Sequence, residues 1–390
     1  MPLPNPTLKR GMIYTNTDTI NAKRDLSEVI DLLDPFETPM LDMVGRDSLS
    51  VPCTQTKHEW MTDRLNPQAG TLASAYVAGS SAMTLTSSEG KFLYTDDLIL
   101  LGNMVFRVES GPPDADVLVV TLLAGTDAAV AAGQPWRKII HAAPEGAPAR
   151  VEQKKTTPEI PYNYTHIVKD WAIVTGTMEH IARYGYVSER AYQEEKILKN
   201  LAMNLENVLI YGVRSWVDGP PRKSTMGGLF DFVFLTGLAA STPWETVKNL
   251  AGEDFTEKEA NNMMQVMWGM GGKPDFWMVN GTNKRRISDW GKPSIRTERT
   301  ETTAGASIGT YESDFGTVDI ILNRNLRASD IIFGTKGSLG IGPLQGRQFS
   351  SKLLPVAGDY TQWEILGEYT MEVSRPSQDF AWFYNTSTVY

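Results

Sequence analysis

The sequence predicts a mixed α+β protein, and three observations lead to this prediction. Short β-branched runs, separated by Gly-Asn and Gly-Pro-Pro turns, gather between residues 92 and 140, as in a small all-β unit. Residues 187–211 carry the strongest helical pattern in the chain. From 257 to 290 a helix, a strand and a helix alternate, which indicates an α/β domain. A chain of 390 residues, 41% of them hydrophobic, can bury such parts in roughly two or three domains.

The composition excludes several classes of function. There are 37 basic and 46 acidic residues, which gives a net charge of −9. A broad grip on nucleic acid needs clustered Lys and Arg, so this balance disfavours it. Cys53 is the only cysteine, so neither an intramolecular disulfide nor a Cys-based zinc cluster can form. Residues 1–21 lack a signal-peptide pattern, and no stretch approaches the roughly 20 apolar residues that span a bilayer. We expect a protein made and used in a reducing, cytosolic setting.

The N-terminal region predicts an arm followed by two short helices. Residues 1–24 are rich in Pro, Asn and Thr and have little capacity to form a core of their own. Residues 25–28 resemble a capping box and start a helix that Pro35 ends. Thr38-Pro39 starts the second helix, and Gly45 ends it. The basic residues of the arm either touch packaged nucleic acid or lie on an acidic neighbouring subunit; they are Lys9, Arg10, Lys23 and Arg24.

Two extended runs flank the β module. Residues 56–64 predict a strand, and the stretch 66–91 after it is polar. Residues 162–175 predict the second run, and neither of its faces is uniformly polar, so the strand needs contacts on both sides. The residues that alternate there are Tyr162, Tyr164 and Val168 on one side, and Ile167, Trp171 and Ile173 on the other.

The C-terminal half combines helices and strands. The amphipathic helix at 187–211 spans roughly 37 Å at about 1.5 Å per residue. Residues 292–316 are polar and contain three glycines, which predicts a long exposed loop. The remaining predicted elements are helices at 257–270 and 283–290 and strands at 276–279, 317–322, 329–334, 361–373 and 379–384.

The most tempting catalytic cluster is His58 with Glu59 and Asp63. Strand alternation turns His58 and Glu59 to opposite faces, so they cannot form a base with its orienting partner, and contact with a neighbour is favoured over catalysis. The glycines at 340–346 predict a turn-rich crossover, because Pro343 and the lack of a following helix do not fit a dinucleotide loop. We expect no enzyme activity, cofactor or metal, since the four histidines are scattered; they are His58, His141, His166 and His180.

The order of these elements resembles the Hong Kong 97-like fold of tailed-bacteriophage major capsid proteins. The similarity is most specific at residues 36–45 and 58–65, and at Val174-Thr175-Gly176-Thr177, which leads into the long helix. The module at 92–140 resembles a β insertion that a subgroup of these proteins carries in the extended hairpin called the E-loop. The resemblance implies an N-arm at 1–35, the start of the P-domain at 36–55, an E-loop at 56–175 with the insertion at about 92–150, a P-domain spine helix region at 176–224, an A-domain at 225–345 and a return to the P-domain at 346–390.

The function implied by the resemblance is self-assembly. Pentamers and hexamers of the chain would form an icosahedral head shell that encloses double-stranded DNA without sequence-specific binding, in a virion assembled in the host cytoplasm. Scaffolding and decoration proteins are implied partners, and a membrane is not. A shell protein of a cellular nanocompartment with the same fold is the main alternative, and a hydrolase using His58 and Asp63 is a weaker one. The expected inter-subunit contact residues are Lys9, Arg10, Lys23, Arg24, His58, Trp60, Arg64, Tyr162, Tyr164, Trp171, Arg296 and Arg299.

Overall fold

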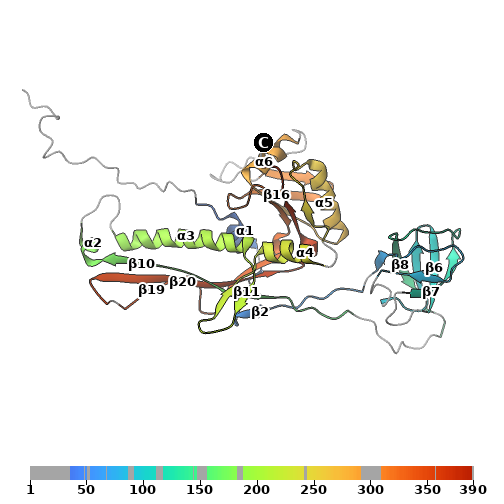
Figure 1. Ribbon diagram of the computed structural model, residues 1–390, viewed down its shortest axis with the longest axis horizontal. Helices are drawn as coiled ribbons and strands as arrows, with labels where there is room; N and C mark the ends of the chain where they lie inside the picture. Colours follow the sequence, from blue (N-terminus) through green and yellow to red (C-terminus); the bar gives the residue numbers. More distant parts are fainter. Residues whose placement is uncertain are drawn as a thin grey trace, which may run out of the picture. The chain divides into compact units, whose positions relative to one another are not determined.

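The computed structural model divides the chain into two compact units, which Figure 1 shows in ribbon form. Unit 1 consists of residues 1–58 and 162–390, and unit 2 consists of residues 59–161. The helix predicted before Pro35 lies outside the described residues. The residues that the structure describes are 36–47, 49–50, 53–66, 68–86, 92–110, 117–143, 145–146, 156–181, 188–240, 244–290, 309–355 and 357–388.

Unit 2 is a closed β-barrel. Its sheet runs in the order β3-β8-β5-β6-β7-β4. A bridge between Leu72 and Leu85 joins the two outermost strands, because Thr86 N–H donates to the Thr71 carbonyl at 2.9 Å and Ala73 N–H to the Thr84 carbonyl at 3.0 Å. Closure leaves the sheet without an open edge. The strands are β3 (Ala69–Thr71), β4 (Ala82–Thr84), β5 (Asp97–Leu101), β6 (Met104–Ser110), β7 (Val117–Ala124) and β8 (Pro135–His141).

The barrel begins earlier in the chain than the sequence indicated. β3 and β4 lie in the stretch 66–91, which was interpreted only as polar, and the module was expected to begin at about residue 92. Three-residue strands made of Ala, Gly, Thr and Met carry too little alternation to be recognised. The interior is apolar and includes Phe106 and Trp136, which are 0% and 1% exposed.

A buried carboxylate lies at one end of the barrel. Asp97 is fully buried, and its carboxylate accepts hydrogen bonds from Lys138 Nζ at 2.6 Å and from the Tyr94 N–H at 2.7 Å. The imidazole Nδ1 of His141 lies 3.0 Å from the same carboxylate. His141 is therefore part of an ion cluster that joins β5 to β8.

Unit 1 contains the long helix and two mixed sheets. Its helices are α1 (Pro39–Asp47), α2 (Gly176–His180), α3 (Glu189–Tyr211), the π-helix η2 (Phe230–Leu235), α4 (Thr236–Ala239), α5 (Glu257–Gly269), α6 (Gly281–Asp289), the 3-10 helix η3 (Lys336–Ser338) and α7 (Pro376–Asp379). Its strands are β1 (Leu49–Ser50), β9 (Tyr162–Tyr164), β10 (His166–Thr175), β11 (Ser215–Val217), β12 (Lys223–Thr225), β13 (Val247–Asn249), β14 (Phe276–Val279), β15 (Gly309–Ser313), β16 (Gly316–Leu322), β17 (Ile331–Gly334), β18 (Leu339–Pro343), β19 (Ser350–Leu353), β20 (Tyr360–Val373) and β21 (Phe380–Tyr384).

The first sheet of unit 1 runs β1-β18-β20-β10, with β19 paired to β20. β10 and β20 pair antiparallel along their length, from His166 opposite Tyr369 to Thr175 opposite Tyr360. α3 lies along this strand pair in Figure 1. Ser188 caps the helix through a hydrogen bond from the Ala191 N–H, and Leu201 and Leu205 are buried.

The second sheet runs β13-β21-β17-β14-β16-β15 and holds an extensive apolar core. Trp277 and Phe333 stack at its centre, with ring centroids 4.5 Å apart. Met263, Met264 and Met267 of α5 belong to the same core. β14, β16 and β17 confirm the strands predicted at 276–279, 317–322 and 329–334 within one or two residues at each end.

Three predictions of local structure need correction. The strand expected at 56–64 is only β2 (Lys57–Glu59), followed by a single bridge between Thr62 and Glu159. The glycine-rich run at 340–346 is mostly strand β18 and not a crossover. The end of the loop expected at 292–316 is strand β15, whereas 291–308 lies outside the described residues. Among the strands of residues 346–390, β19 and β20 lie in the first sheet and β21 lies in the second, beside β17.

Candidate assembly interface

The outer face of β10 carries a row of exposed apolar side chains. Alternation turns Val168 and Val174, each 6% exposed, toward the side that α3 covers. It turns Ile167, Trp171 and Ile173 to the opposite side, where they are 44%, 57% and 53% exposed. Large apolar groups in one row on an uncovered sheet face mark a surface for protein contact.

Charged groups are interspersed with this apolar row. Lys169 lies between Ile167 and Trp171 on the exposed face, and its Nζ is 3.6 Å from Oε1 of Glu364 on β20. β20 in turn pairs with β19, whose four residues are all exposed. The face therefore combines an apolar centre with polar surroundings, which is the arrangement found at protein–protein interfaces.

Two expected contact residues, Tyr162 and Tyr164, already have partners within unit 1. Their rings meet edge to face, with centroids 5.5 Å apart, and Tyr164 also packs on Trp216 at 4.8 Å. Lys57 Nζ lies 4.5 Å and the Arg214 guanidinium 5.3 Å from the centre of the Tyr162 ring. These cation–π and ring contacts hold β9 against β2 and the β11–β12 hairpin.

Asn163 fixes this region and was missed by the sequence analysis. Its side-chain amide donates to the carbonyls of Gly227 and Met371 at 2.9 and 2.7 Å. Its side-chain oxygen Oδ1 accepts from the backbone N–H groups of Gly227 and Tyr164 at 2.8 and 2.9 Å. The Asn163 side chain is fully buried, and its hydrogen bonds to Gly227 and Met371 join β9 to two distant parts of the chain. A lone Asn in an aromatic strand gave no signal for this role.

His58 and Asp63 make contacts with side chains that are far from them in the sequence. Nε2 of His58 lies 3.4 Å from the Glu372 carboxylate on β20, and the two side chains are only 15% and 19% exposed. Asp63 accepts from the Arg64 N–H at 2.8 Å and from the Thr156 hydroxyl at 3.1 Å. Glu59 is exposed. Within the described part of the chain no group of three or more His, Cys, Asp or Glu side chains could hold a metal ion.

The chain segments that lead into and out of the barrel expose apolar side chains that were not predicted. Trp60, an expected contact residue, is 8% exposed, and its backbone N–H donates to the Pro161 carbonyl at 3.1 Å. Its neighbours Met61 and Leu65 are 80% and 93% exposed, and Ile160 on the returning segment is 59% exposed. Arg64 is also exposed.

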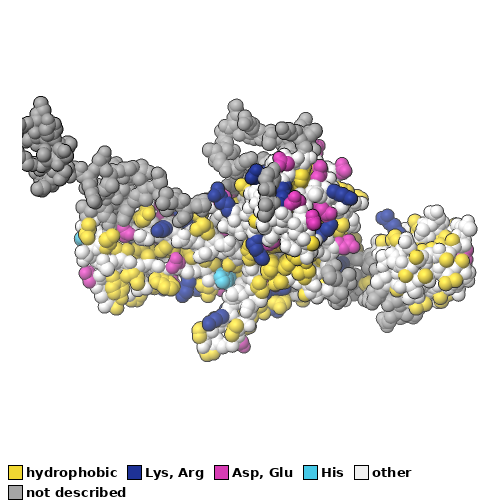
Figure 2. Space-filling view, turned by 45° about the horizontal axis from the view of Figure 1, so that its top comes forward, with side chains coloured by type: hydrophobic (Ala, Val, Ile, Leu, Met, Phe, Trp, Pro, Cys, Tyr) yellow, Lys and Arg dark blue, Asp and Glu magenta, His cyan; other side chains and the backbone are white. Residues whose placement is uncertain are grey.

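The outside of the barrel adds a second apolar surface. Figure 2 shows hydrophobic side chains spread over its visible face, with few charged groups between them. The large ones that are at least one third exposed are Val77, Leu100, Val117, Val119, Leu123, Ile139 and Ile140. A monomer in water gains nothing from such groups, whereas a partner that covered them would.

The root of the N-terminal region is held by a buried carboxylate on α3. Oε1 of Glu206 accepts from the Met40 N–H at 2.9 Å and from Nδ2 of Asn323 at 2.7 Å, and Oε2 accepts from the Leu41 N–H at 2.7 Å. Burial raises the pKa of Glu206, and these hydrogen bonds oppose the rise. The first turn of α1 is thus attached to α3, with its free N–H groups satisfied.

Three further expectations concern basic contact residues, the single cysteine and a membrane-spanning helix. Six expected contact residues lie outside the described residues: Lys9, Arg10, Lys23, Arg24, Arg296 and Arg299. Cys53 is buried, its thiol donates to the Gln55 carbonyl at 3.0 Å, and burial raises its pKa, so it is not an activated thiolate. Over the described ranges, no helix has the length and apolar character needed to cross a membrane.

Comparisons with known proteins agree with the fold. A family model described as SU10 major capsid protein matches residues 13–386. The capsid of cyanophage A-1(L) is similar with a TM-score of 0.54 and 9% identity, over 96% of this chain and 100% of that one. The capsid of an empty GTA particle gives a TM-score of 0.52 and 11% identity, over 94% and 95% of the two chains.

Two further comparisons contribute less. The holo-SrpI encapsulin complex from Synechococcus elongatus PCC 7942 gives a TM-score of 0.44 and 11% identity, over 60% of this chain and 79% of that one. That score is too low to support the nanocompartment alternative. A search of the curated proteins finds no match.

Proposed function

This chain belongs to the SU10 major capsid protein family, and from that premise we propose how its surfaces build a shell. The family match over residues 13–386 is the observation that carries the function. The chain is a structural component of a virus capsid with the Hong Kong 97-like fold. Pentamers and hexamers of the chain form the icosahedral head of a tailed phage, assembled in the host cytoplasm.

The domain roles follow the chain in order. Residues 1–35 serve as the N-arm, 56–175 as the E-loop with the barrel inserted in it, and 225–345 as the A-domain. The P-domain combines 36–55, the spine helix region 176–224 and the return at 346–390. α3 lying along the β10–β20 pair supports this assignment, because it supplies one long rigid element on which neighbours can align.

The exposed face of β10 is the strongest contact surface of unit 1. Among the expected contact residues, His58, Trp60, Tyr162 and Tyr164 are largely engaged within their own units. Trp171 is 57% exposed, in a row of apolar groups that α3 does not cover. A second copy that buried this row would remove apolar area from water at roughly 25 cal/mol per Å².

DNA is enclosed without being held tightly. The net charge of −9 works against broad phosphate binding, so the lining of the shell does not immobilise the genome. The basic residues of the arm, Lys9, Arg10, Lys23 and Arg24, neutralise either DNA or an acidic neighbour. Scaffolding and decoration proteins are further proposed partners. We assign no catalytic role to His58 or Asp63, because His58 contacts Glu372 on β20 and Asp63 accepts a hydrogen bond from the Arg64 backbone N–H.

A single substitution tests the proposed surface. Trp171→Glu places a charge in the centre of the apolar row without touching the side of β10 that faces α3. We expect the protein concentration needed for particle formation to rise by at least roughly tenfold, as for loss of an interface aromatic. Light scattering and negative-stain microscopy of the co-expressed or reassembled protein measure this.

The matched control is Trp268→Glu on α5, since Trp268 is 60% exposed and the chemical change is identical. The new carboxylate of the Trp171 variant lies opposite Glu364 on β20, so its free energy of unfolding should fall by no more than about 1 kcal/mol, and the Trp268 variant should unfold at the wild-type urea midpoint. Normal particle formation by the Trp171 variant would exclude the face of β10 as an assembly surface, while the capsid function itself would stand. A wild-type chain that stays monomeric under every assembly condition would contradict the capsid function.

A further inference from the structure

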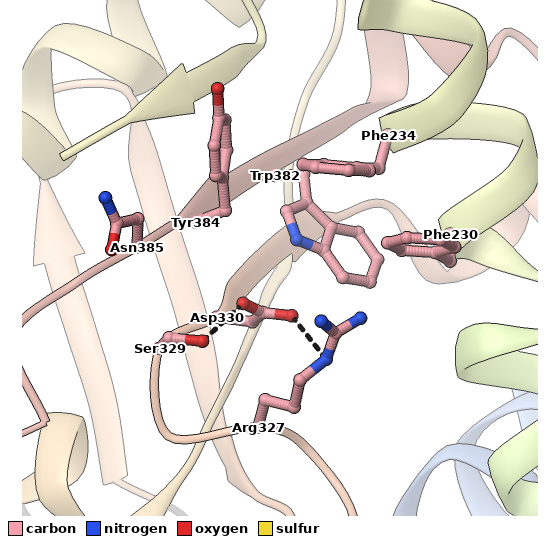
Figure 3. A pocket seen from close by; sticks show the side chains of 8 residues that line it. All are labelled: Phe230, Phe234, Arg327, Ser329, Asp330, Trp382, Tyr384 and Asn385. Carbon is pink, nitrogen blue, oxygen red and sulfur yellow. Dashed lines mark hydrogen bonds and ion pairs between the residues drawn. The ribbon is translucent and has the colours of Figure 1, made fainter. Parts of the chain in front are cut away.

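An aromatic pocket lies between η2 and β21 in unit 1. It has a volume of about 220 Å³ and is lined by Phe230, Phe234, Arg327, Ser329, Asp330, Trp382, Tyr384 and Asn385. Figure 3 shows the four aromatic rings side by side, with the Arg327 guanidinium below Trp382 and Phe230. The volume is smaller than the roughly 300 Å³ at which ligand pockets begin, so it suits one or two side chains of a peptide better than a cofactor.

The rings are held in place by one another and by the π-helix. Phe230 and Phe234, one turn apart on η2, stack with centroids 4.8 Å apart. Trp382 meets Phe230 at 5.7 Å, and Tyr384 meets Phe234 edge to face at 5.0 Å. π-Helical turns are rare and occur frequently at functional sites. Trp382 is 0% exposed and supports the other rings from beneath, so the preformed aromatic wall open to a partner consists of Phe230, Phe234 and Tyr384.

The polar side of the pocket is neutral and offers hydrogen-bond donors. Nε of Arg327 lies 3.4 Å from Oδ2 of Asp330, and Ser329 donates to Oδ1 of Asp330 at 2.9 Å. The Arg327 side chain is 56% exposed, and its guanidinium lies 4.5 Å from the Tyr211 ring centre. Because its terminal N–H groups face the pocket in Figure 3, they can donate to carbonyls of a bound peptide.

Two acidic residues lie beside β21, along the edge of the strand that pairs with β13. Gly252 N–H donates to the Asn385 carbonyl at 2.7 Å, and Ser387 N–H to the Glu253 carbonyl at 3.0 Å, so Glu253 is carried alongside the pocket wall. Further along the same edge of β21, the Trp382 backbone N–H donates to the Thr246 carbonyl at 2.8 Å, next to Glu245. Both carboxylate side chains are exposed.

The N-terminal sequence has the matching chemistry. Residues 1–10 read Met-Pro-Leu-Pro-Asn-Pro-Thr-Leu-Lys-Arg, with prolines at 2, 4 and 6 and two basic residues at 9 and 10. Proline fixes its own φ, so such a sequence favours the polyproline II conformation, whose carbonyls make no internal hydrogen bonds. Proline-rich segments dock in aromatic-lined grooves because little entropy is lost on binding.

We propose that this pocket binds the proline-rich N-terminal segment of a second copy of the chain. Pro4 and its neighbours pack on the aromatic wall, Arg327 donates to their carbonyls, and Lys9 and Arg10 lie near Glu245 and Glu253. The inference rests on the proposed shell, because assembly brings the arms of other copies to the pocket at high local concentration.

Disulfide trapping between two kinds of copies tests this inference. One kind carries Leu3→Cys. The other carries Ser329→Cys at the pocket wall and a C-terminal tag that changes its mass. Cys53 is 1% exposed, so the introduced thiols dominate the reaction. After co-assembly and mild oxidation of intact particles, we expect a mixed covalent dimer on a non-reducing gel, which only contact between copies can produce.

The controls separate the pocket from general proximity. Ser351→Cys on β19 is the same chemical change at an exposed site on the other sheet, and it should give little mixed dimer. Adding P2A, P4A and P6A to the Leu3→Cys copies should slow trapping at Ser329→Cys roughly tenfold.

The outcomes differ from those of the assembly test. Intact particles without mixed dimer, equal trapping at the two serine sites, or trapping that ignores the three prolines would each overturn the docking. Failure of the unmodified chain to form particles would instead overturn the shell on which the docking rests.

Discussion

Glu206 illustrates how one residue joins distant parts of unit 1. Its two carboxylate oxygens satisfy the N–H groups of Met40 and Leu41 and the amide of Asn323. Glutamine at this position has a single acceptor oxygen, so an N–H group would face another donor. We expect Glu206→Gln to destabilise unit 1 by about 1–3 kcal/mol, measured as a lower urea midpoint at pH 7. Glu195→Gln on the exposed side of α3 should stay within about 0.5 kcal/mol.

The loss caused by Glu206→Gln should depend on pH. Burial raises the folded-state pKa of Glu206 above its ordinary value of 4.5, so the folded state keeps the proton to higher pH than the unfolded chain does. The associated stability is complete below pH 4.5 and is lost as pH rises through the folded-state pKa. Glutamine does not titrate, so the gap between variant and wild type should narrow from pH 5 to pH 8. A gap that widens over this range would contradict a raised pKa.

At the scale of residues, the sequence could give exposure patterns but not partners. The alternation at 162–175 places Ile167, Trp171 and Ile173 on one face, and the structure confirms that they share an exposed face. The contact of His58 with Glu372 joins residues 314 positions apart, and that of Met40 with Glu206 joins residues 166 positions apart. No local spacing rule reaches across such distances.

At the scale of elements, glycine at position 228 lets the following chain pack directly against the backbone at the end of α3. A Cβ at Gly228 would lie 2.4 Å from the Val208 carbonyl oxygen and 2.5 Å from that of Leu209, both backbone atoms of α3 that cannot swing away. Gly228→Ala should therefore cost about 1–3 kcal/mol, seen as a lower melting temperature. Gly269→Ala on α5, with nothing within 4 Å of the new Cβ, should be neutral or stabilise by up to about 1 kcal/mol. Equal melting temperatures for the two variants would show that α3 can shift.

Elements with a strong periodic signal were predictable, and those defined by pairing were not. The helix predicted at 187–211 is α3 at Glu189–Tyr211, because a capping serine and a steady apolar stripe are local features. Closure of the barrel depends on β3 and β4, each three residues long, whose partners lie elsewhere in the chain. η2 contains Phe-Asp-Phe-Val-Phe-Leu, and its helical state depends on packing against β21. Tertiary contacts outweigh local preference there.

At the scale of the whole molecule, unit 2 has what an independent domain needs. Its sheet is closed, its apolar core is its own, and Asp97 is paired inside the same barrel. We expect residues 59–161 expressed alone to fold, with a cooperative thermal transition and a blue-shifted tryptophan emission from buried Trp136. Asp97→Ala should abolish the transition or lower it strongly, because it removes the buried carboxylate that pairs with the partly buried side chains of Lys138 and His141. A broad, non-cooperative melt of the unmodified fragment would mean that the barrel needs the rest of the chain.

The fold class and the capsid resemblance came from the order of elements, which survives when individual residues change. The sequence predicted the contact surfaces only in part, because a side chain such as Tyr162 or Trp60 can pack equally well within its own unit or against a neighbouring copy. Only the arrangement of β2, β9 and β11 around Tyr162 and Tyr164 shows that these rings are already packed.

The bridge between Thr62 and Glu159 has a consequence for how such shells diversify. It sets the chain segments that enter and leave the barrel next to each other. Unit 2 is also one continuous stretch of sequence, so one uninterrupted stretch of gene encodes the whole inserted module. A single recombination event can then add, remove or exchange it without disturbing the order of the surrounding parts. We expect the same position to accept a foreign folded domain whose two ends lie together, such as an antigen or an enzyme to be displayed on a particle.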